Sequence, residues 1–326
     1  MVNRSRLFWD KFPVWVIGFC LLGLTYWPLR GMFYSADPVG PSMLDFPGGL
    51  FLTIFLLISA IVIVPFTISE RTTSSLFALF LASGGVCLRS GRLNELIVPA
   101  SQTQAVFGQF IATTIWLLGI AAVLTFAIQF LRKIVRKFLS ALAYKPLFQC
   151  MSKDEFDRLP ELKRDNPEVE KYMQANVEYI PTDFAPDNKD AGKTPALKEF
   201  LPELAGFIVT VAAVGVIVSA VLMRSAERGQ LIFSLLAGFT LAGYLAGKLF
   251  PTRRTQFAWC GAGLGALIIY VIAYFTQANV PLNNVMPQFQ ALPCDWFSAA
   301  GAGALLGAWL NQRAEDSNIA ELLEQK

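Results

Sequence analysis

The chain has 326 residues, a formal net charge of +3 and no histidine. Hydrophobic residues make up 54% of it and charged residues only 16%, whereas soluble domains carry about 25% charged residues. This shortage of charge excludes an intrinsically disordered chain and an ordinary water-soluble globule. The missing histidine excludes Ser-His-Asp and Cys-His nucleophile systems, His-ligated zinc and His-ligated haem.

Long apolar segments recur along the chain and predict an all-α, polytopic transmembrane helical bundle. We expect about eight spans in two groups of four, with a small cytoplasmic helical insert between the groups. The segments cover residues 13–29, 48–68, 74–88, 105–131, 203–223, 230–250, 257–276 and 296–310.

The third segment, residues 74–88, is short for a span of about 20 residues. It is either a short span or a re-entrant hairpin. If all eight segments cross, most Lys and Arg residues outside the spans fall on the side of the N-terminus. The positive-inside rule then places both termini in the cytoplasm, and the re-entrant alternative weakens this bias. We therefore expect eight spans, in a bacterial cytoplasmic membrane.

The predicted organisation has four parts. Residues 1–131 form an N-terminal membrane bundle of four spans. Residues 132–202 form a basic interfacial helix and the cytoplasmic insert. Residues 203–311 form a glycine-rich C-terminal membrane bundle, and residues 312–326 form a cytoplasmic tail.

No charged residue falls near the middle of a predicted span. Charges deep in a bilayer mark ion or substrate paths, so their absence disfavours ion-coupled transport. Glu203, Lys248 and Asp295 fall at span ends, where we expect them to reach headgroup water.

Milder polar residues lie inside the fourth span. Buried amides and hydroxyls in a membrane either hold helices together or line a cavity. The candidate cavity-lining residues are Gln109, Thr113, Thr114 and Gln129.

Three consecutive spans of the second half carry glycine pairs at four-residue spacing. Small residues at this spacing let helix backbones approach closely in a membrane. The pattern predicts tight packing, within the chain or against another chain. The pairs are Gly243 and Gly247, Gly261 and Gly265, and Gly303 and Gly307.

The fourth span continues into an amphipathic, basic segment that we expect to end before Pro146. Clustered cations beside a membrane helix attract anionic lipid headgroups. They also serve as an ordinary positive-inside anchor, and both interpretations stay open. The cations are Arg132, Lys133, Arg136 and Lys137.

The stretch 149–200 carries twelve acidic and eight basic residues. It contains no phosphate-binding or metal-ligand motif, and its predicted role is contact with a membrane or cytoplasmic protein partner. The five cysteines have no metal-ligand spacing. We expect isolated buried thiols, with a Cys87–Cys294 bridge as the alternative.

These features predict an integral membrane subunit or scaffold of a larger assembly, without catalysis of its own. The alternative is a permease, channel or lipid-handling protein driven by a partner chain or a gradient. An intramembrane enzyme would have to use the carboxylates at headgroup level, Asp45, Glu70, Glu203 and Asp295. No cofactor, metal or nucleic-acid partner is predicted.

Overall fold

The computed structural model describes residues 11–27, 29, 46–89, 93, 100–139, 197–250 and 254–324. These residues form helices joined by short connections, with no strand among them, which confirms the all-α prediction for this part of the chain. Eight of the helices have 15 residues or more.

The first half contributes α2 (Phe12–Tyr26), α4 (Phe46–Phe66), α5 (Thr72–Arg89) and α6 (Thr103–Phe138). The second half contributes α11 (Leu197–Leu222), α12 (Arg228–Leu249), α13 (Ala258–Thr276) and α15 (Gly301–Glu324). Short elements complete the described fold: η3 (Ala100–Gln102), η6 (Thr255–Phe257), η7 (Leu282–Asn284), η8 (Pro287–Phe289), α14 (Pro293–Asp295) and the π-helical turn η9 (Trp296–Ala300).

Four helices are long and apolar enough to cross a membrane. They cover Ala100–Phe138, Leu201–Leu222, Arg228–Leu249 and Thr255–Thr276. The first half has three shorter apolar helical stretches, Phe12–Tyr26, Leu50–Phe66 and Thr72–Val86. The chain is therefore an integral, multi-pass membrane protein by the length and composition of its helices.

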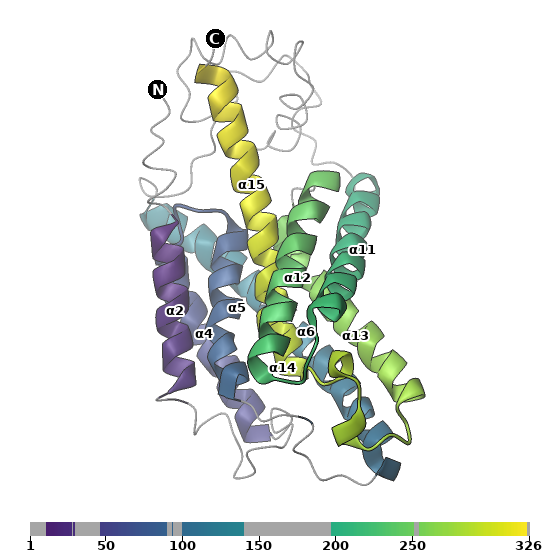
Figure 1. Ribbon diagram of the computed structural model, residues 1–326. Helices are drawn as coiled ribbons and strands as arrows, with labels where there is room; N and C mark the ends of the chain where they lie inside the picture. The colour runs from purple at the N-terminus through teal and green to yellow at the C-terminus, as the bar shows by residue number, and fades with distance from the viewer. Residues whose placement is uncertain are drawn as a thin grey trace.

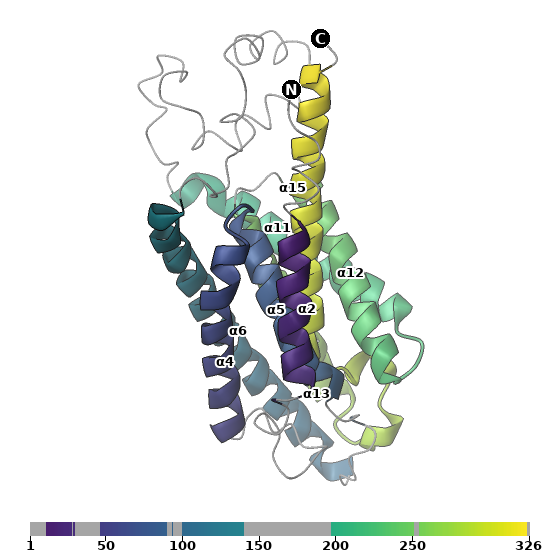
Figure 2. The same cartoon turned by 90° about the vertical axis from the view of Figure 1, so that its left-hand side faces the viewer.

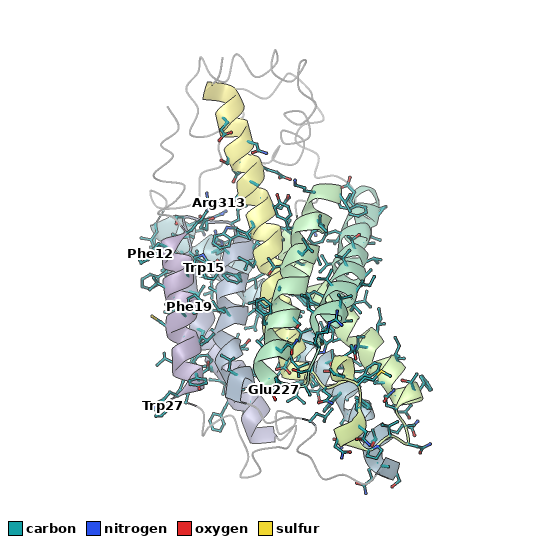
Figure 3. The ribbon with its side chains drawn as sticks, viewed as in Figure 1. Phe12, Trp15, Phe19, Trp27, Glu227 and Arg313 are labelled. Atoms are coloured by element: carbon teal, nitrogen blue, oxygen red, sulfur yellow. The ribbon has the colours of Figure 1, made fainter. Side chains whose placement is uncertain are left out.

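Successive long helices run in opposite directions (Figures 1 and 2). The start of α2, the α4–α5 turn and the ends of α6, α12 and α15 therefore share one end of the bundle, which we call the α15 end. Figure 3 shows Phe12 and Arg313 toward this end, and Trp27 and Glu227 toward the opposite end. Beyond the bundle, α15 projects past the ends of its neighbours (Figure 1).

The two sequence halves are interleaved in space. Within the halves, α2 packs against α5, and α12 packs against both α11 and α15. Across them, α6 packs against α13 and α5 packs against α15. Aromatic pairs such as Phe80–Phe297 and Phe110–Tyr270, with ring centroids 4.7 and 5.3 Å apart, bind the halves together. The helical core is thus shared by both halves.

The weak third segment is α5, a single uninterrupted helix, so it does not have the form of a re-entrant hairpin. Nearly all its described side chains from Thr73 to Val86 are buried, between α2, α4, α6 and α15. Two of its buried serines are satisfied locally: Ser74 and Ser83 donate to the carbonyls of Arg71 and Phe80. Because α5 contacts protein rather than lipid, it tolerates serine and threonine hydroxyls. These residues lower the hydropathy of the segment, which is why it was a weak candidate for a span.

As predicted, the fourth span continues into the basic segment, because α6 runs unbroken from Thr103 to Phe138, about 54 Å at 1.5 Å per residue. Two other predicted boundaries shift. The predicted tail is helical, since α15 continues to Glu324. In the second half, α11 begins at Leu197 and contains Pro202. The remainder of the insert lies outside the described residues.

The glycines at the α12–α15 contact stand where backbones meet. A methyl group on Gly243, Gly303 or Gly307 would collide with the carbonyl of a residue on the facing helix. Gly247 faces the side chain of Asn311. Glycine is the residue that permits such an approach, because any side chain would push the two helices apart.

The other two glycines of the pattern, Gly261 and Gly265, face Val211 and Val216 of α11. The first half has a close approach that the pattern did not predict. A methyl group on Gly85 of α5 would collide with the backbone and side chains of α2. At the same contact, the Thr25 hydroxyl donates to the Ala82 carbonyl over 2.8 Å.

Candidate functional site

The α4–α5 turn presents a carboxylate to the interior of the α15 end. The turn is held by two backbone bonds, from the Thr67 amide to the Ile63 carbonyl and from the Glu70 amide to the Thr67 carbonyl, each 3.0 Å. The hydroxyls of Thr67 and Ser75 are 2.7 Å apart and tie the turn to α5. As a result Glu70 is only 1% exposed.

Two side chains of α15 meet the Glu70 carboxylate. Arg313 forms an ion pair with Oε1, and the Trp309 indole N–H donates to Oε2 over 3.1 Å. Trp309 and Arg313 are four residues apart and therefore lie on the same face of α15. Both are buried, at 1% and 9% exposure. The contact joins the first and last quarters of the chain.

Arg132 of α6 closes the turn from the other side. Its guanidinium donates to the Thr67 carbonyl over 3.0 Å, to the Ser75 hydroxyl over 2.7 Å and to the Glu70 carbonyl. Arg132 is 2% exposed. The prediction that it contacts lipid headgroups is wrong, because three acceptors in the α4–α5 region bind it inside the protein.

The other three basic residues of that segment differ from Arg132. Lys133 and Lys137 are exposed, and Arg136 is half-buried. Since Arg132 and Lys133 are adjacent in a helix, they point about 100° apart, one into the bundle and one out of it. Anionic-lipid contact remains a prediction for these three residues.

Further bonds extend this cluster across the α15 end. Arg71 donates to Asp316 over 2.9 Å. Thr255 of η6 lies 2.9 Å from the Thr73 hydroxyl and accepts from the Gln312 amide over 2.6 Å. We call the whole set the Glu70 network: Thr67, Glu70, Arg71, Thr73, Ser75, Arg132, Thr255, Trp309, Gln312, Arg313 and Asp316.

The Glu70 network contains three arginines and two carboxylates. Burial lowers the pKa of the ammonium of Lys11, which precedes α2, and repulsion from Arg313 lowers it further. The network therefore joins several helices, and its Arg313 also acts on the start of α2.

A second ion pair lies toward the opposite end of the bundle. The Arg228 guanidinium, at the start of α12, donates through both terminal nitrogens to Asp295 of α14. The Leu292 amide also donates to Asp295 Oδ2, over 2.7 Å. Asp295 is 0% exposed, so the prediction that it reaches headgroup water is wrong. A bidentate arginine and a backbone amide replace that water.

The neighbouring Cys294 carries a thiol, 3.8 Å from Asp295 Oδ1, and is not in a disulfide. The alternative of a Cys87–Cys294 bridge is therefore wrong. Cys294 is buried, as expected for an isolated thiol, whereas Cys20 is exposed.

The predicted cavity-lining residues do not converge on one passage. Gln109 is exposed and Gln129 is half-buried. The hydroxyls of Thr113 and Thr114 donate to carbonyls of their own helix over 2.7 and 2.8 Å. Thr114 lines a mainly apolar cavity of about 20 Å³, which has room for about one water molecule.

The remaining candidates do not join either ion pair. Glu203 and Lys248 are exposed, as expected at span ends, and Asp45 lies outside the described residues. Within the described residues, no group of three or more His, Cys, Asp or Glu side chains is placed to hold a metal ion.

Glu70, Arg132 and Asp295 could each be identified from the sequence, but their partners could not. Glu70 and Arg313 belong to opposite ends of the chain, and no local spacing links them. One signal was available: Glu70, Arg132 and Arg313 all border predicted spans on the same predicted side of the membrane. Opposite charges at one membrane level are candidates for pairing.

No protein-family model matches the chain, and no curated protein or solved structure matches it.

Proposed function

We propose that this chain is a subunit or scaffold of a larger membrane assembly and carries no catalysis of its own. In this proposal all eight long helices, four from each half of the sequence, cross a bacterial cytoplasmic membrane, and both termini are cytoplasmic. The insert at 149–200 and the α15 end then face the same compartment, where a partner protein would dock.

The observation that carries the proposal is the projection of α15 beyond the bundle (Figures 1 and 2). The Glu70 network fixes the base of this projection, through Trp309, Arg313 and Asp316. Past the network, Ser317, Asn318 and Glu321 are exposed. A helix that is fixed where it leaves the bundle, and that has exposed polar side chains beyond that point, can present a surface to a partner.

The buried ionisable groups also favour a structural role. Each of four such groups bonds to an element other than its own. They are Glu70, Arg132, Arg228 and Asp295. Such pairs hold helices in register, and breaking one leaves a costly unpaired charge.

The permease or channel alternative has weaker support. It requires polar side chains of α6 to face a shared passage. Gln109 is exposed instead, and the hydroxyls of Thr113 and Thr114 are occupied by the α6 backbone.

Affinity purification from native membranes in a mild detergent tests the proposal. The tagged full chain is compared with a variant in which residues 151–194 are replaced by a Gly/Ser linker of equal length. We expect the full chain to elute with a stoichiometric partner, identified by mass spectrometry, and the linker variant to lose that partner.

Thermal unfolding of both chains provides the control, because the linker variant must retain the midpoint of the full chain. A double variant, Lys133→Gln with Lys137→Gln, leaves the insert intact and should retain the partner. If the full chain elutes as a monomer bound only to detergent and lipid, the scaffold proposal fails.

A further inference from the structure

An apolar groove runs between α12 and α15 on the surface of the bundle. Its volume is about 430 Å³, within the range of about 300–1,000 Å³ typical of ligand sites. The α12 wall includes Phe233, Ala237, Leu241 and Tyr244, and the α15 wall includes Leu306 and Leu310.

The groove follows from how the two helices meet. The contact glycines Gly243, Gly303 and Gly307 place backbone against backbone. The larger side chains therefore stand to the side of the contact and form walls above it. The lining carries two hydroxyls, on Thr240 and Tyr244, and the Thr240 hydroxyl donates to the Leu236 carbonyl over 2.7 Å. The rest of the groove surface is apolar.

The groove has a cation at one end. Lys248 follows Tyr244 by one helical turn, and its ammonium lies 5.2 Å from the centre of the Tyr244 ring. Lys248 is exposed, and it belongs to the last turn of α12, at the α15 end of the bundle. An apolar channel on a membrane-spanning helix thus leads toward a positive charge at the membrane boundary.

We propose that this groove binds one acyl chain of an anionic phospholipid, whose phosphate is held by Lys248. The apolar walls match a hydrocarbon chain, and the single cation matches a headgroup with negative charge. A lysine near the membrane surface favours an anionic lipid by about 1 kcal/mol, which corresponds to a preference of about fivefold.

Native mass spectrometry of the full chain, released from nanodiscs of equal phosphatidylglycerol and phosphatidylcholine, tests the proposal. The unaltered chain is expected to retain about one phospholipid, with phosphatidylglycerol favoured about fivefold. Ala237→Phe fills the groove and is expected to lose most of the retained lipid. Lys248→Gln is expected to keep the lipid and lose the headgroup preference.

Matched variants outside the groove serve as controls. Ala112→Phe adds the same ring at an exposed position of α6, and Arg224→Gln removes an exposed cation from the connection between α11 and α12. Neither is expected to change retention or preference at the groove. Lys248 is exposed, so Lys248→Gln remains informative if Ala237→Phe does not fold.

Three results overturn the proposal. One is equal lipid retention by Ala237→Phe and Ala112→Phe. Another is an unchanged phosphatidylglycerol preference in Lys248→Gln. The third is a dimer of the unaltered chain that Ala237→Phe dissociates, which would assign the groove to a second copy of this chain.

Discussion

Glu70 is a buried carboxylate with two side-chain partners. One balances its negative charge, and the other orients the carboxylate. Arg313 supplies the opposite charge, and the Trp309 N–H supplies a directed hydrogen bond. Removing a charge from water costs several kcal/mol, and a partner recovers this cost only with good geometry and further hydrogen bonds. Loss of one partner should therefore be more damaging than loss of both.

Glu70→Gln leaves Arg313 buried without its counter-charge, and we expect it to lower the free energy of unfolding by about 3–5 kcal/mol. The double variant Glu70→Gln with Arg313→Met removes both charges and should be more stable than the single variant. Unfolding in mixed detergent micelles, followed by tryptophan fluorescence, measures both. If the double variant loses as much unfolding free energy as Glu70→Gln and Arg313→Met lose together when measured singly, the two side chains are not coupled.

Arg132 and Lys133 provide a comparison between neighbouring residues. Arg132→Gln removes a cation that three acceptors share, so we expect a loss of at least about 2 kcal/mol in unfolding free energy. Lys133 is exposed, and Lys133→Gln should stay within about 0.5 kcal/mol of the unaltered chain. The same micelle titration measures the difference, and equal losses would contradict the buried placement of Arg132.

The sequence predicts these residues only in part. Apolar runs locate the span ends, so Glu70, Arg132 and Asp295 could be placed at membrane boundaries from composition alone. Whether a boundary residue faces lipid or protein depends on which helices are neighbours. That information lies in the pairing of α6 with the α4–α5 turn and of α12 with α14, which no local pattern encodes.

Among the described elements, α12 and α15 have the most extensive contact between long helices. Gly307→Ala places a methyl group against the Thr240 carbonyl, and overpacking of this kind costs about 1–3 kcal/mol. Gly119→Ala is the matched control in α6, because no atom lies within 4 Å of the added methyl group. That change should be neutral or stabilising by about 0.5–1 kcal/mol.

Thermal unfolding in detergent compares the two variants. We expect a lower midpoint for Gly307→Ala and an equal or higher midpoint for Gly119→Ala. If both variants unfold at the midpoint of the unaltered chain, α12 and α15 are not as close as described.

Helix locations could largely be predicted from the sequence, since every apolar segment corresponds to a helix of the described chain. The glycine spacing also pointed to α12 and α15. Gly85 was missed because it has no glycine partner four residues away, and its contact with α2 depends on Thr25 and Leu22 of another helix. Spacing within one helix therefore identifies only part of the close contacts.

For the molecule as a whole, alternating helix directions place Asn284 and Ser317 at opposite ends. Both are exposed. With the proposed orientation, Asn284→Cys should react with a membrane-impermeant maleimide in intact spheroplasts, and Ser317→Cys only after permeabilisation. The unaltered chain, with its native cysteines, gives the background. The reverse labelling pattern would invert the orientation, and labelling of both sites in intact cells would contradict an opposite placement.

The enclosure of α5 has a consequence for biogenesis. Its serines and threonines are accommodated because other helices surround them, and those helices include α15, which is synthesised last. A segment with this composition partitions into lipid less readily than its apolar neighbours. On leaving the translocon, α5 should therefore remain beside α2 and α4, and reach its final surroundings only when synthesis of the chain is nearly complete.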